Sequence, residues 1–179
     1  MILRPLRPAD ADQALAAHAV MAREGFPFLL SDPPAPGSAR LDAEWPAFLA
    51  RVERERRGQG LPPGWVRATF LVAEVEGQIV GRVSIRHELT EALRRLGGHV
   101  GYGVLPAHRG RGYATVMLRA ALGLLGSDGV DEALVTCEDA NAASAAVIER
   151  CGGRLVQRLE VDGRLTRHYL VPTAAFTRE

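Results

Sequence analysis

Hydrophobic residues along the chain follow two spacings, one typical of helices and one typical of strands. Helical spacing occurs in four segments, 11–24, 41–57, 112–125 and 141–151. Short apolar or alternating runs typical of strands occur in seven segments, 1–7, 68–75, 78–89, 99–105, 132–138, 154–161 and 164–172. Asp10 precedes the first helical segment, where we expect it to act as the helix cap.

The segments between these elements indicate how the elements are connected. Glu76-Gly77 and Asp162-Gly163 each separate two strand-like runs, which predicts two β-hairpins. The proline-rich stretch 25–40 is predicted to be an irregular loop, and 90–98 a connector with one helical turn at most. Hairpins combined with crossover helices predict a single mixed α/β domain over 1–179. We expect a central, twisted, mostly antiparallel mixed sheet of about seven strands, flanked by about four helices.

Composition narrows the class of protein. The chain has 179 residues, 47% of them hydrophobic, and a formal net charge of +1. A general nucleic-acid binder usually has a basic excess, so no nucleic-acid partner is expected. No apolar run is long enough to span a membrane, and the first residues lack a secretory pattern. The two cysteines, Cys137 and Cys151, are expected to be reduced and partly buried, and the protein to be cytoplasmic.

The stretch VGYGVLPAHRGRGYATVML (100–118) places a strand directly before a loop rich in glycine and arginine, which runs into a helix. A helix N-terminus has unpaired N–H groups and a partial positive charge. Gly110 and Gly112 permit tight curvature and a close approach of the backbone to a ligand. Arg109 and Arg111 add donors suited to phosphate. The segment therefore predicts a pyrophosphate-binding loop.

Two common nucleotide-binding patterns do not fit this loop. A P-loop requires Gly-Lys-Ser/Thr after four spacer residues, and the chain has no such run. A dinucleotide fingerprint requires glycine or alanine where Thr115 stands, and an acidic residue at the end of the next strand. Asp131 lies before that strand instead.

Arg109 to Ala114 instead fits the pattern Arg/Gln-x-x-Gly-x-Gly/Ala. With the preceding GYGVLPAH and the downstream NAASAAVIERCGG, the segment resembles the acyl-coenzyme A loop and the Asn-x-x-Ala/Ser helix of the GNAT N-acetyltransferase superfamily. A solvated, arginine-rich surface turn is the alternative, which the flanking strand and helix disfavour. The resemblance implies a GNAT-like fold with an acetyl-CoA-binding core over 98–152 and a variable acceptor-side segment over 24–64. It implies acetyl-CoA as the acyl donor and no metal.

The resemblance also assigns residues to acetyl-CoA. The backbone of Val104 and Leu105 would pair with the pantetheine arm like an additional strand. Asn141 and Ser144 would contact the cofactor from the following helix, although Asn141 also suits a plain helix cap. The pyrophosphate would be held by the loop residues Arg109, Gly110, Arg111, Gly112, Tyr113 and Ala114.

Amine acetylation needs a base for the amine proton, and proteins resembling this one often place it near the start of the strand before the loop. The candidate catalytic residues are His99, Tyr102 and Glu88, with His87 beside Glu88. Each also has an ordinary interpretation, as a solvent-exposed strand end, a core aromatic or a surface carboxylate. Many such enzymes have a proton-donating tyrosine where this chain has Ile148. Cys151 lies near, but no residue along the sequence activates its thiol.

Two functions follow from these assignments. The first is an N-acetyltransferase that transfers the acetyl group of acetyl-CoA directly to a primary amine of a small molecule or peptide in a ternary complex. The alternative, which Ile148 motivates, is a non-catalytic acyl-CoA-binding sensor or partner module. A homodimer is one expected assembly, because dimers are frequent among proteins of this kind.

Overall fold

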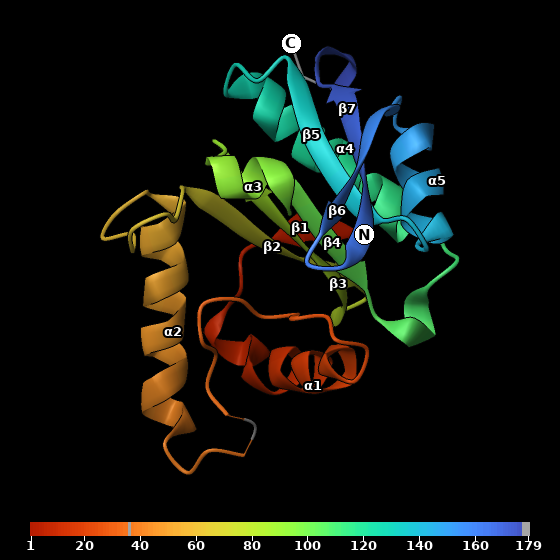
Figure 1. Cartoon of the computed structure of the whole chain (residues 1–179). Helices are drawn as coiled ribbons and strands as arrows, with labels where there is room; N and C mark the ends of the chain where they lie inside the picture. Colours follow the sequence, from red (N-terminus) through yellow and green to blue (C-terminus); the bar gives the residue numbers. More distant parts are fainter. Residues whose placement is uncertain (36, 177–179) are drawn as a thin grey trace.

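The computed structural model describes residues 1–35 and 37–176. Within these residues the chain forms seven strands and five α-helices (Figure 1). The strands are β1 (Ile2–Arg4), β2 (Ala68–Val75), β3 (Gln78–Arg86), β4 (Val100–Val104), β5 (Glu132–Glu138), β6 (Arg154–Val161) and β7 (Arg164–Pro172). The helices are α1 (Ala11–Ala22), α2 (Leu41–Arg56), α3 (Glu91–Arg95), α4 (Tyr113–Ser127) and α5 (Ala142–Arg150). The mixed α/β class and the seven predicted strands are confirmed.

The seven strands are divided between two antiparallel sheets. The first sheet has the order β1-β2-β3-β4, and the second has the order β5-β7-β6. β4 and β5 are therefore edge strands, and they face each other. They meet at one end, where Gly98 forms a bridge with Val135 and the His99 N–H donates to the Leu134 carbonyl at 2.7 Å. Beyond that point no ladder hydrogen bonds join them within the described chain, so the two strands diverge.

Each face of the first sheet packs on a different group of helices. On one face, side chains of β3 and β4 join a core with α4, α5 and the second sheet, which includes Val83, Met117 and Ile148. On the other face, Phe70 and Val72 of β2 pack against α1 and α2. In Figure 1, α1 lies below the strands and α2 stands at the left, away from α4 and α5. Because side chains alternate along a strand, each β-strand residue of the first sheet belongs to one of these two sides.

Local sequence signals account for most connections. Glu76 and Gly77 have φ of 50° and 78°, and Asp162 and Gly163 have φ of 50° and 75°, as type I′ hairpin turns require. The connector at 90–98 contains α3, whose first turn is capped by the Thr90 hydroxyl. Both cysteines are free and buried.

The prediction that the Asp10 side chain caps α1 is wrong. Asp10 stands at the N-cap position, but its carboxylate makes no cap bond to α1. It accepts instead from the Arg4 guanidinium at 2.6 and 2.9 Å and from the Arg7 N–H at 2.6 Å. The Asp10 carboxylate therefore binds the buried guanidinium of Arg4 and not the free N–H groups of the first turn of α1.

Candidate functional site

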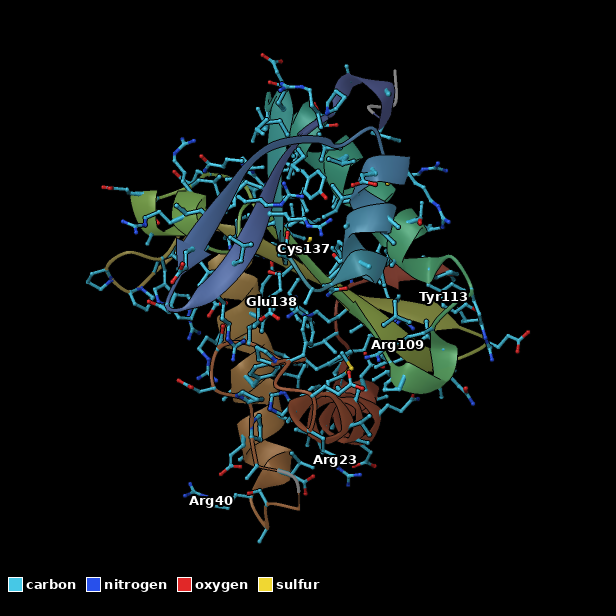
Figure 2. The ribbon with its side chains drawn as sticks, turned by 45° about the vertical axis from the view of Figure 1, so that its right-hand side comes forward. Arg23, Arg40, Arg109, Tyr113, Cys137 and Glu138 are labelled. Atoms are coloured by element: carbon cyan, nitrogen blue, oxygen red, sulfur yellow. The ribbon has the colours of Figure 1, made fainter. Side chains whose placement is uncertain are left out.

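The predicted loop connects the diverging edge of β4 to the N-terminus of α4. After Val104 the chain forms a short 3-10 turn over Pro106–His108, and Gly112 then occupies the N-cap position of α4 with φ of 80°. A Cβ atom at Gly110 or Gly112 would meet nothing within 4 Å, so no protein atom occupies the space above the loop backbone at these two residues. Figure 2 shows Arg109 and Tyr113, from the start of the loop and the start of α4, toward the right of the molecule.

The first turn of α4 is not capped by the protein. No side chain caps the helix, and within the described residues no acceptor is bonded to the N–H groups of Tyr113, Ala114 and Thr115. By contrast, the Asn141 Oδ1 accepts from the Ser144 N–H at 3.0 Å and so caps α5. The amides that begin α4 are thus free to bind an anion.

The two loop arginines lie differently. Arg111 is exposed, and its guanidinium only approaches the Ala107 carbonyl, at 3.5 Å. Arg109 folds back toward the end of α1, where its guanidinium forms an ion pair with Glu24. Its Nε also donates to the Val104 carbonyl at 3.1 Å. Arg109 therefore links the loop both to β4 and to the segment after α1.

Val104 and Leu105, at the free edge of β4, differ in their backbone hydrogen bonds. The Leu105 N–H donates to Val80 at 2.9 Å, and the Leu105 carbonyl accepts from the His108 N–H at 2.8 Å. Residues along an antiparallel strand alternate in direction, so the backbone groups of Val104 and Tyr102 point away from β3, toward β5. The Val104 carbonyl accepts from Arg109, so at Val104 the N–H is the backbone group without a partner among the described residues.

A tyrosine, a serine and a cysteine meet across the gap between β4 and β5. The Tyr102 hydroxyl lies 2.8 Å from the Ser144 Oγ of α5. Burial raises the pKa of Tyr102, so the phenol stays protonated. Burial also raises the pKa of the Cys137 thiol on β5, although a hydrogen bond with Ser144 acts against that increase. Ile148, at the position where many similar proteins have a tyrosine, is fully buried and apolar.

His99 lies where the two sheets meet. Its Nδ1 accepts from the Leu134 N–H at 2.9 Å, and its ring is buried. Burial lowers the pKa of His99, so the imidazole is neutral at pH 7. The lone pair of Nδ1 is used by this hydrogen bond, so His99 can take a proton only if that bond is released.

Glu88 and His87 lie just after the end of β3 and differ in their surroundings. Glu88 is exposed. The Nδ1 of His87 pairs with Asp128, and its Nε2 lies 2.8 Å from the Thr69 hydroxyl. His87 therefore ties the C-terminus of α4 to the first sheet, and it is near enough to His99 to contribute to the lowered pKa of that residue. The side-chain hydrogen bonds of His87 go to Asp128 and Thr69 and not to His99 or Tyr102.

Two further charged residues near the site were not identified from the sequence. Glu24 was missed because its partner, Arg109, is 85 residues away along the chain. Arg82 was missed because an arginine within an apolar strand pattern is expected to face outward. In the structure it is only 4% exposed. A charged residue inside a run of buried-type residues was the signal available.

Two hollows flank the first sheet. A shallow, mainly apolar hollow lies between α1 and the turn after β4, and its lining includes none of the loop residues from Arg109 to Ala114. A smaller hollow lies between α2 and the first sheet, with Ser31, Glu55 and Ser84 as its polar lining residues. Ser84 pairs with Gly101, so this smaller hollow adjoins the start of β4 on the α1–α2 side.

No helix within residues 1–35 and 37–176 is both long enough and apolar enough to cross a bilayer. The same residues contain no group of three or more histidine, cysteine, aspartate or glutamate side chains arranged to hold a metal ion.

Comparison with known proteins adds a family to this geometry. A family model described as an acetyltransferase (GNAT) domain matches residues 1–154. The structure of Mycobacterium smegmatis RimJ in complex with CoA-disulfide is 26% identical, with a TM-score of 0.64, and the match covers 94% of this chain and 79% of that chain. No curated protein matches the sequence.

Two more distant structures share the fold. The yncA protein from Salmonella typhimurium with its cofactor acetyl-CoA is 18% identical, with a TM-score of 0.62 and coverage of 96% of this chain and 93% of that chain. The ribosomal-protein-S5-alanine acetyltransferase from Vibrio fischeri is 18% identical, with a TM-score of 0.63 and coverage of 98% and 94%.

Proposed function

The chain belongs to the GNAT acetyltransferase family and is an acyltransferase, and from this premise we propose that it transfers the acetyl group of acetyl-CoA to a primary amine by direct attack in a ternary complex. The observation that carries the proposal is the uncapped N-terminus of α4, which opens beside the gap between β4 and β5. Two of the similar structures contain CoA-disulfide or acetyl-CoA. Bound acetyl-CoA would supply an activated acetyl thioester.

The loop would hold the pyrophosphate mainly through its backbone. The N–H groups of Tyr113, Ala114 and Thr115 point toward the helix end, where the helix dipole favours negative charge. Gly110 and Gly112 keep side chains away from this surface. Arg111 would add a charge-assisted contact, and Arg109 would do so after release from Glu24.

The gap would hold the pantetheine arm. The free Val104 N–H provides one strand-like hydrogen bond at the edge of β4, whereas both backbone groups of Leu105 already bind within the protein. Asn141 can serve as a helix cap through Oδ1 and still donate from its amide nitrogen. These contacts would bring the thioester past Tyr102 and toward the closed end of the gap at His99.

Many similar enzymes have a tyrosine hydroxyl at the position of Ile148, and here the hydrogen-bonded hydroxyls of Tyr102 and Ser144 would take its place. The phenol is protonated and hydrogen-bonded to Ser144, so it can donate a hydrogen bond to the negative charge that develops on sulfur as the C–S bond breaks. As the neutral amine attacks, the C–N bond forms, the C–S bond breaks and the amine loses one proton. A base accepts that proton and passes it to the leaving thiolate, so coenzyme A leaves as the thiol and the acetyl group passes directly to the amine. Cys151 has its pKa raised by burial, which also disfavours a thiolate nucleophile.

His99 is the proposed acceptor of the amine proton, with Glu88 as the alternative. Because burial lowers the pKa of His99, the neutral form persists below pH 6.5. The N–H bond from Leu134 must be released when the ring takes a proton. His99→Asn retains an acceptor for that N–H, and so separates loss of the base from loss of the contact.

The proposal is tested by release of coenzyme A from acetyl-CoA across a panel of amines and peptide N-termini. We expect release that depends on an acceptor, and a decrease of about a hundredfold or more in kcat/KM for His99→Asn or for Glu88→Gln, whichever residue is the base. If acetyl-CoA binds and no acceptor accelerates release, the chain does not catalyse direct transfer to an amine. Unchanged kcat/KM in both variants would contradict the assignment of either residue as the base.

A further inference from the structure

Arg82 is a buried cation with no anionic partner in the described chain. It lies in β3 opposite Val72 and Gly103, on the face of the first sheet that carries α1 and α2. α4 lies on the opposite face, and the loop before it reaches around to Glu24 after α1 through Arg109. Arg82 therefore belongs to the side from which an acceptor would approach β4.

The guanidinium is satisfied only in part. One terminal nitrogen donates to the Gly101 carbonyl at 3.0 Å, and the other to the Pro27 carbonyl at 2.8 Å. Nε is buried without a partner. The guanidinium carbon lies 4.4 Å from the centre of the Phe26 ring. A guanidinium has five N–H donors; these two bonds go to neutral carbonyls, and none of its bonds goes to a carboxylate of the described chain.

No described carboxylate neutralises this charge. The charged group that affects Arg82 most is a second cation, Arg86, and burial together with Arg86 lowers the pKa of Arg82 to about 9. The residue is still protonated at pH 7. A buried charge without an opposite charge is costly, and a neutral donor such as glutamine could hold the same two carbonyls without that cost. A role in holding the two carbonyls therefore does not explain why the residue is positively charged.

Arg82 is only 4% exposed, so an anion would reach the guanidinium by displacing the residues that cover it. Gly101 and Gly103 present no side chains toward it, and a Cβ at Gly103 would collide with the Phe26 ring at 2.6 Å. Pro27, whose carbonyl accepts from the guanidinium, is exposed, and Phe26, whose ring lies against it, is half-buried. Gly25, with φ of 71°, begins this covering segment. The hollow at Ser84 opens two residues further along the same face of β3.

We propose that Arg82 binds a carboxylate carried by the acceptor, so that the preferred acceptors are amines that also bear a carboxylate, such as free amino acids. The carboxylate takes the donor that now binds the Pro27 carbonyl, together with the unpaired Nε, as a side-on pair of hydrogen bonds. Arg82 lies opposite Gly103, between Tyr102 and Val104 on β4, so the amine of such an acceptor is directed toward the gap. This inference rests on the proposed acetyl transfer and defines its acceptor.

The test compares matched acceptors with the wild-type enzyme. Phenylalanine, phenylalanine amide and phenylethylamine form one set, and alanine, alaninamide and ethylamine form a second. We expect kcat/KM for the acid to exceed that for the amide and the amine by about tenfold or more in at least one set. Calorimetric titration of the enzyme–coenzyme A complex with the same compounds is expected to show the same order of affinity.

Variants then assign the preference to Arg82. Arg82→Gln is expected to remove the preference for the acid, while Arg82→Lys retains part of it. Arg86→Gln is the matched control, because Arg86 is also a largely buried arginine of β3 that binds only carbonyls, those of Gly97 and Gly98. It is expected to keep the preference. If Arg82→Gln does not fold, the wild-type comparison and Arg82→Lys still decide.

The outcomes separate this inference from the proposed function. Equal or faster transfer to the amides and amines overturns the carboxylate site but leaves acetyl transfer intact. Binding of acetyl-CoA without transfer to any of the acids also overturns it. Failure to bind acetyl-CoA contradicts the proposed function itself, and the acceptor inference falls with it.

Discussion

At the scale of single residues, the site depends on polar groups held in apolar surroundings. Tyr102 reaches from β4 to Ser144 on α5 and crosses the gap in which we place the acyl donor. Its neighbours Cys137 and Ile148 are buried. The Tyr102 ring packs in the core, and its hydroxyl is available in the gap. The sequence places Tyr102 on the correct strand, but its partner Ser144 follows 42 residues later and could be found only in the structure.

Tyr102→Phe is expected to lower kcat by about tenfold, because the hydrogen bond to the developing charge on sulfur is lost. Loss of the bond to Ser144 also lowers the free energy of unfolding by about 1 kcal/mol. Steady-state kinetics and urea unfolding measure the two effects. Tyr169→Phe is the matched control, because its buried ring also donates from a hydroxyl to α5, at Glu149. Equal losses of kcat in the two variants would show that Tyr102 acts only through stability.

At the scale of elements, the loop before α4 is connected to the segment after α1. Glu24 pairs with Arg109, and the hydrogen bond with Arg109 lowers the pKa of the Glu24 carboxyl. The chain continues through Gly25 to Phe26 and Pro27, which cover Arg82. One ion pair therefore joins the surface proposed for the acyl donor to the segment proposed to cover the acceptor side.

Glu24→Gln is expected to increase the affinity for acetyl-CoA by about two- to fivefold, because the carboxylate no longer competes with phosphate for Arg109. The effect should decrease as salt is added, since both side chains are exposed. Calorimetry at low and high salt measures it. Glu53→Gln, which breaks an exposed pair with Arg56, is the control and should leave the affinity unchanged. Weaker binding by Glu24→Gln would mean that Glu24 positions Arg109 for the ligand.

At the scale of the whole molecule, periodicity predicted the elements well and their spatial relations only in part. The two Gly-containing hairpins and the helix after the loop follow from local patterns, because turn geometry and helical spacing are local properties. The point at which β4 and β5 meet before they diverge could not be predicted, because it is set by long-range contacts of Gly98 and His99 with Val135 and Leu134. The roles of Arg82 and Glu24 depend on similar long-range contacts.

Histidine burial predicts how stability depends on pH. Burial lowers the pKa of four histidines, His18, His87, His99 and His168, below the value of 6.5 expected in the unfolded chain. The unfolded state therefore binds more protons just below pH 6.5, and stability falls as the pH decreases through that value. Carboxyl groups with lowered pKa, such as those of Asp10 and Asp139, add to this loss only near and below pH 4.

We therefore expect the urea midpoint to decrease between pH 7 and pH 5, before the carboxyl groups are protonated. Unfolding at half-unit intervals of pH measures the change. A midpoint that is constant down to pH 5 would show that these histidines are as easily protonated in the folded chain as in the unfolded one.

The central claim is that the amides at the start of α4 bind the pyrophosphate of acetyl-CoA, and calorimetric titration of two glycine variants tests it most directly. Gly112 and Gly129 lie at opposite ends of α4, with φ of 80° and 83°, and a Cβ at either meets nothing within 4 Å. Valine at either position therefore costs a similar amount of stability, about 1–2 kcal/mol. The account predicts that Gly112→Val weakens acetyl-CoA binding tenfold or more while Gly129→Val binds like the wild type. Equal affinities in the two variants, or a wild-type chain that does not bind acetyl-CoA at millimolar concentration, would contradict it.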